Sequence, residues 1–101
     1  MIYIFDLDGT ICEESPLKDG TSQDFQESYR SLEPILPTII KIVNLYSDGH
    51  KIIIWTARYI EDFTLTETWL REHNVPYHEL HLGKVKGDYY VDVNNLRPDE
   101  L

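Results

Sequence analysis

Short apolar runs alternate with helical patterns along the whole chain, and this alternation restricts the possible folds most. Ile2 to Phe5 and Lys51 to Trp55 have the β-branched and aromatic character of buried strands. Apolar residues recur at helical spacing over 35–46 and again over 61–73, and shorter apolar stretches at 80–82 and 89–91 predict two more strands. This order predicts an α/β, three-layer, doubly wound (Rossmann-like) fold around a small, mainly parallel sheet of about four strands.

The chain is long enough for one core only, and no repeat or linker divides its 101 residues. A single domain over 1–101 is therefore expected. Residues 11–33 are polar and contain Pro16 and Gly20, which predicts a loop or flap on the surface with room for one short helix. Only residues 83–88 separate the third predicted strand from the fourth, which is close to the shortest link that can cross a sheet. We therefore expect a very short third strand and an extended 83–88 segment.

The charge balance restricts the possible partners. Nine Lys and Arg against 18 Asp and Glu give a net charge of −9, so neither nucleic acid nor an anionic membrane is an expected partner. No apolar run is long enough to cross a membrane, and no signal peptide is evident at Met1. Cys12 is the single cysteine, which fits a reducing compartment. A cytoplasmic protein is expected.

Polar residues follow the predicted strands at the point where each one ends. Asp6 and Asp8 follow the first strand, Thr56 the second and Asp92 the fourth, and Lys84 lies in the loop after the third. Ligands of parallel sheets bind at the carboxyl ends of the strands, so these side chains are expected to converge. Three gathered carboxylates repel one another unless a cation joins them, and Mg²⁺ is bound by carboxylates together with phosphate oxygens. The pattern favours phosphoryl transfer.

Four motifs in this order resemble those of the haloacid dehalogenase-like (HAD) phosphohydrolases. They are Phe-Asp-Leu-Asp-Gly-Thr at 5–10, Ile-Trp-Thr-Ala-Arg at 54–58, Gly-Lys at 83–84 and Tyr-Val-Asp at 90–92. Over essentially its whole length the chain is similar to short members without a cap domain, including capsular-polysaccharide-biosynthesis phosphatases. The resemblance implies an open site, covered by residues 11–33 or by a neighbouring subunit of a homo-oligomer.

The resemblance also implies a reaction. The chain would be a Mg²⁺-dependent phosphomonoesterase that acts through an aspartyl-phosphate on a small phosphorylated metabolite, such as a sugar phosphate of polysaccharide biosynthesis. Asp6 would be the nucleophile, and Asp8 would protonate the leaving alcohol and later take a proton from water. Thr56 would donate a hydrogen bond to the phosphoryl oxygens, and Lys84 would offset their charge.

The resemblance assigns ligands as well. Mg²⁺ would be held by the Asp6 carboxylate, the backbone carbonyl of Asp8 and the Asp92 carboxylate. The substrate-binding positions would be Gly9, Thr10, Ala57 and Arg58, with Arg58 as a fork for phosphate. These ligand roles require Asp92 to lie near Asp6, and a separation of more than about 10 Å would contradict them.

Two departures from the family pattern leave alternatives open. Val93 stands where a second acid usually follows Asp92, so a catalytically weak or inactive phospho-ligand-binding protein is the main alternative. Lys86 stands near Lys84 and competes with it as the phosphate lysine, although Lys84 is favoured. A phospho-acceptor module of the response-regulator receiver class is less favoured, because the second strand ends at Thr56 rather than at an aspartate.

Overall fold

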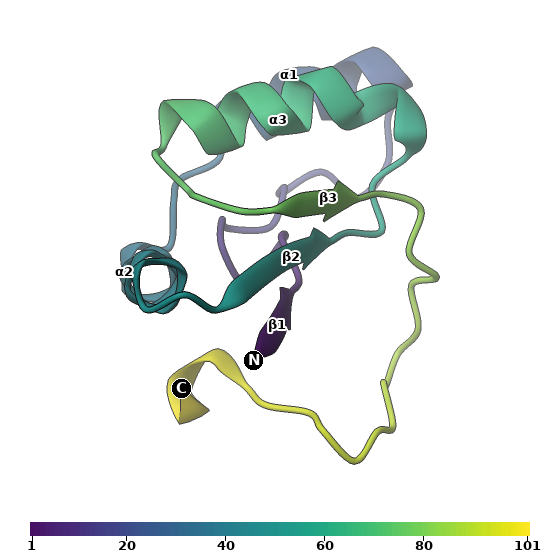
Figure 1. The fold of residues 1–101 in the computed structure, drawn as a ribbon. Helices are drawn as coiled ribbons and strands as arrows, with labels where there is room; N and C mark the ends of the chain where they lie inside the picture. The colour runs from purple at the N-terminus through teal and green to yellow at the C-terminus, as the bar shows by residue number, and fades with distance from the viewer.

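The computed structural model describes residues 1–101 and shows a three-stranded parallel sheet with the order β1-β2-β3 (Figure 1). The strands are β1 (Ile2–Phe5), β2 (Lys51–Trp55) and β3 (Glu79–His81). Phe5 pairs with Ile54, and Ile54 pairs in turn with Leu80, so the carboxyl ends of all three strands meet at one edge. The first two strands and the very short third strand confirm the sequence-based expectation.

Three α-helices accompany the sheet. They are α1 (Ser22–Arg30), α2 (Leu36–Ser47) and α3 (Phe63–Glu72), with two 3-10 turns, η1 (Ile60–Asp62) and η2 (Pro98–Glu100). Helix α1 lies inside the segment that was expected to be a flap, and it begins with a capping box between Thr21 and Asp24. It lies beside α3, as Figure 1 shows. No helix combines the length and the apolar character needed to cross a bilayer.

The core lies on one face of the sheet only. Phe5, Ile52 and Ile54 are buried there in one cluster with side chains from all the connecting segments. The alternate residues of the same strands point to the opposite face, where Ile4 is 59% and Trp55 is 43% exposed. The expected third layer is therefore absent. Successive right-handed crossovers that step in one direction along a sheet place their helices on the same face.

The predicted fourth strand at 89–91 is wrong for this structure. After β3 the C-terminal segment (residues 83–101) leaves the sheet and passes below it in an extended path (Figure 1). Tyr89 is 88% and Val91 is 98% exposed, and the far end of the segment is held to α2 by a 2.6 Å hydrogen bond from Lys41 Nζ to the carbonyl of Pro98. The six-residue link at 83–88 does not cross the sheet, so β1 remains an edge strand.

Candidate functional site

The chain turns sharply after β1, and Gly9 makes the turn possible. Three successive amides, from Thr10 to Cys12, point at the carbonyl of Leu7 at 2.8–3.2 Å. Gly9 adopts φ 82°, a conformation that side chains disfavour, and a Cβ there would lie 2.9 Å from Oε1 of Glu14. The turn keeps Asp6 and Asp8 at the strand end, as the first motif predicts. Thr10 is half-buried within the same turn.

Asp6 is the partly buried carboxylate at the end of β1. Burial raises the pKa of its side chain above the ordinary 3.8, and the nearby charges of Asp8 and Glu14 act in the same direction. The Leu7 amide and the positive charge of Lys84 oppose this rise. Asp6 therefore lies within electrostatic reach of two carboxylates and one lysine. Glu14 was not expected here, because its residue type and neighbours are those of a solvated loop.

Backbone hydrogen bonds join the loops that follow β2 and β3. The Lys84 amide donates to the carbonyl of Thr56 at 3.0 Å, and the Gly83 amide donates to the carbonyl of Arg58 at 2.9 Å. Thr56 is buried, and its hydroxyl accepts a 3.2 Å hydrogen bond from the Arg58 amide, which leaves the hydroxyl hydrogen free to donate. Half-buried Ala57 lies between them. The second and third motifs therefore meet, as the sequence predicts.

The two candidate lysines differ in their surroundings. Lys84 is half-buried and carries its ammonium over two aromatic rings, 5.1 Å from the centroid of Trp55 and 4.4 Å from that of Tyr90. Its charge also acts on Asp6. Lys86 is exposed. These surroundings favour Lys84 as the lysine that faces the strand ends.

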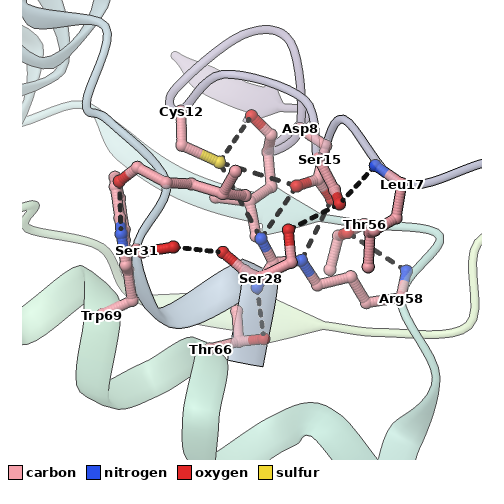
Figure 2. A network of polar contacts seen from close by, with 12 residues as sticks. Asp8, Cys12, Ser15, Leu17, Ser28, Ser31, Thr56, Arg58, Thr66 and Trp69 are labelled. Atoms are coloured by element: carbon pink, nitrogen blue, oxygen red, sulfur yellow. Dashed lines mark hydrogen bonds and ion pairs between the residues drawn. The ribbon is translucent and has the colours of Figure 1, made fainter. Parts of the chain in front are cut away.

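Arg58 is buried and binds Asp8 rather than facing solvent. Its Nε donates to Oδ2 of Asp8 at 3.0 Å and its Nη2 donates to Oδ1 at 2.8 Å (Figure 2). The arginine side chain is 3% exposed, whereas the Asp8 side chain is 27% exposed. A carboxylate of the protein therefore occupies the fork that the resemblance assigns to phosphate.

Two side chains from helices complete the surroundings of Arg58. Thr66 of α3 accepts a 3.0 Å hydrogen bond from Nη1, and the ring of Tyr29 of α1 stacks on the guanidinium at 3.9 Å. Nothing in the sequence around Tyr29 or Thr66 indicates an arginine as their common partner.

The structure does not bring Asp92 to Asp6. Asp92 lies exposed on the C-terminal segment, where its carboxylate accepts a 2.6 Å hydrogen bond from the Val93 amide. No group of three or more His, Cys, Asp or Glu side chains could hold a metal ion. With Asp92 on the exposed segment, these residues as they stand do not form the magnesium site that the resemblance implies, which needs the carboxylates of Asp6 and Asp92 together with the backbone carbonyl of Asp8. The difference follows from the missing fourth strand.

The Cys12 thiol is unreactive. It is fully buried, and burial with the charge of Asp8 raises the pKa of its thiol to about 12. A thiol with such a pKa holds its proton at neutral pH and is not a nucleophile. Cys12 is a member of the buried core cluster.

The fold is similar to that of solved proteins. The chain is 29% identical to a crystal structure described as an MCSG target from Vibrio cholerae, with a TM-score of 0.75 over 98% of this chain and 85% of that one. It is 22% identical to a chain in the structure of a Pnkp1/Rnl/Hen1 complex, with a TM-score of 0.65 over 90% of this chain and 30% of that one. No protein-family model and no curated protein matches the chain. The comparisons thus support a small α/β fold.

Proposed function

We propose that this protein is a phosphomonoesterase that uses Asp6 as its nucleophile. The observation that carries the proposal is the position of Asp6, half-buried at the end of β1 and within electrostatic reach of Lys84 and Asp8. Parallel sheets bind their ligands at this edge, and two further loops meet there around Thr56. The substrate class we propose is a small phosphorylated metabolite, with the sugar phosphates of polysaccharide synthesis as the first compounds to test.

The proposed reaction has two steps. A carboxylate oxygen of Asp6 attacks phosphorus, the bond from phosphorus to the alcohol oxygen breaks, and the alcohol leaves with a proton from Asp8. Water then attacks phosphorus and gives a proton to Asp8, and the bond to Asp6 breaks to release inorganic phosphate. Lys84 and the Thr56 hydroxyl stabilise the charge on the phosphoryl oxygens.

We also propose Mg²⁺ as the cofactor, on grounds of charge. Three carboxylates gather around the site (Asp6, Asp8 and Glu14), against the cations Arg58 and Lys84. A phosphate ester adds negative charge, which a divalent cation would offset. The ligand set would be complete only with residues 89–93 beside the free edge of β1, as the fourth strand of a HAD-like core. Asp92 would then stand at the strand end.

One assay tests the proposal. We expect the wild-type protein to hydrolyse p-nitrophenyl phosphate with Mg²⁺, and we expect Asp6→Asn or chelation with EDTA to abolish turnover. Acid-quenched protein should carry one phosphoryl group on Asp6, detectable by mass spectrometry. Turnover that survives in Asp6→Asn would exclude Asp6 as the nucleophile. If the wild type is active, a panel of phosphorylated metabolites would identify its substrate.

The second candidate is a catalytically inactive protein that binds a phospho-ligand. It is favoured by one observation, the position of Asp92 on the exposed C-terminal segment, together with Val93 beside it. Such a protein would bind inorganic phosphate in a calorimetric titration and turn over none of the esters. A receiver-like module has less support, because β3 ends at His81 and presents no aspartate there.

A further inference from the structure

We propose that Arg58 is a positioning residue, which holds both carboxylate oxygens of Asp8 and aims Asp8 as the base that deprotonates the hydrolytic water. This inference rests on the proposed function and adds to it the residue that orients its acid–base group. It also replaces the expectation that Arg58 binds phosphate.

The geometry of the Arg58–Asp8 pair supports this role. Two parallel hydrogen bonds, of 3.0 and 2.8 Å, join the guanidinium fork to the carboxylate. This bidentate contact suits an ionised carboxylate and fixes its plane. Oδ1 also accepts a 3.6 Å hydrogen bond from the Cys12 thiol, but Oδ2 accepts only from Arg58 and keeps a second lone pair. The Asp8 side chain is 27% exposed, so this oxygen can still accept a proton from water.

The guanidinium is itself fixed from the other sides. Thr66 accepts from Nη1 at 3.0 Å, Cys12 Sγ lies 3.8 Å from Nη2, and the Tyr29 ring covers the guanidinium plane. Burial alone would lower the pKa of Arg58, but its hydrogen bonds to Asp8 and the charge of Asp8 raise it, so the arginine stays charged. Four of its five N–H groups have protein partners, and the Nε–Nη2 edge that could bind a phosphate in bidentate geometry is occupied by Asp8.

A specific kinetic consequence follows for the second step. The p-nitrophenolate ion leaves without needing a proton, so formation of the aspartyl-phosphate from p-nitrophenyl phosphate does not depend on an acid. Hydrolysis of the intermediate does depend on a base, and misplacing a catalytic base costs about 10²-fold or more in rate. Weakening the hold on Asp8 should therefore make the phosphoenzyme accumulate.

The test is rapid-mixing kinetics of Arg58→Lys with p-nitrophenyl phosphate and Mg²⁺, beside the wild type and the control Arg71→Lys, which alters an exposed arginine of α3. Lysine keeps the charge but cannot donate in the bidentate geometry. We expect Arg58→Lys to release a burst of about one nitrophenolate per site and then turn over about 10²-fold more slowly than wild type. KM should not rise, and Arg71→Lys should match the wild type.

Other outcomes would overturn the inference in distinguishable ways. A raised KM without a burst would make Arg58 a phosphate ligand. If the first turnover and the steady-state rate of Arg58→Lys fell by the same factor, without a burst, the role of Arg58 would be merely structural. If circular dichroism shows that Arg58→Lys does not fold, Thr66→Val is the deciding variant. It removes the hydrogen bond from Nη1 of Arg58 and should give a smaller burst. The absence of a burst in Thr66→Val would overturn the inference. A wild type without turnover would remove the proposed function and this inference with it.

Discussion

The amide of Lys84 is hydrogen-bonded at 3.0 Å to the carbonyl of Thr56, so the loop after β3 is fixed against the loop after β2. This contact holds the Lys84 ammonium where its charge acts on Asp6. Lys86, two residues later, is exposed.

We therefore predict that Lys84→Gln lowers kcat/KM for p-nitrophenyl phosphate by about 10²-fold, which is the typical loss when one donor to a developing charge is removed. Lys86→Gln should change it by less than about threefold. Steady-state kinetics of the two variants, matched in charge change, measure the difference. Equal losses would mean that neither lysine is specific to the site.

Replacing Asp6, the proposed nucleophile, should stabilise the fold. Burial and the charges of Asp8 and Glu14 raise the pKa of Asp6 above 3.8, so the ionised form is disfavoured in the folded state. The folded protein therefore binds the carboxyl proton of Asp6 more tightly than the unfolded chain does. The stability contributed by the neutral form is lost as pH rises through the folded-state pKa of Asp6. We predict a higher Tm for Asp6→Asn at pH 7, and no difference below pH 3.8. If Asp6→Asn and the wild type had equal Tm values at both pH values, the surroundings of Asp6 would not disfavour its ionised form.

A side chain at Gly9 should destabilise the turn after β1. Gly9 and Gly83 both have positive φ, 82° and 81°, but only at Gly9 would a Cβ meet another group, Oε1 of Glu14 at 2.9 Å. Gly83→Ala should cost about 1–2 kcal/mol of unfolding free energy through backbone strain alone. Gly9→Ala should cost more, and adding Glu14→Ala should remove the excess. Urea denaturation measures all three, and an excess that survives Glu14→Ala would place the clash elsewhere.

The sequence predicted the strands and loops whose signals are local. The apolar runs that stop at Asp6 and Thr56 do so in the structure, and Gly9 within the first motif adopts the conformation that its turn needs. The meeting of residues 56–58 with 83–84 followed from the rule that parallel strands share a carboxyl edge.

The features that the sequence did not predict depend on long-range packing. The pattern at 89–91 has the composition of a strand, but strand pairing depends on whether the preceding link spans the sheet, and composition does not determine this. The third layer is absent because both crossovers step in the same direction along the sheet and place their helices on one face. The partner of Arg58 also depends on the fold, since an arginine after a strand binds either a ligand or a protein carboxylate, and only the structure places Asp8 at 2.8 Å.

The C-terminal segment provides the last prediction, which concerns the proposed fourth strand. Tyr89 and Tyr90 are 88% and 50% exposed and should be cut readily by chymotrypsin, as should Tyr59, which is 75% exposed and serves as the internal reference. If Mg²⁺ with orthovanadate draws residues 89–93 to the free edge of β1, cleavage at the first two sites should slow by at least about tenfold relative to Tyr59.

A matched pair of variants shows whether Asp92 is responsible. Asp92→Asn should abolish this protection, because it removes the carboxylate that the magnesium site is proposed to gain. Asp88→Asn makes the same chemical change four residues earlier on the same exposed segment and should leave the protection intact. Unchanged cleavage of the wild type with Mg²⁺ and vanadate would mean that the segment does not pair with β1, and would favour a protein that binds phosphate without metal-assisted turnover.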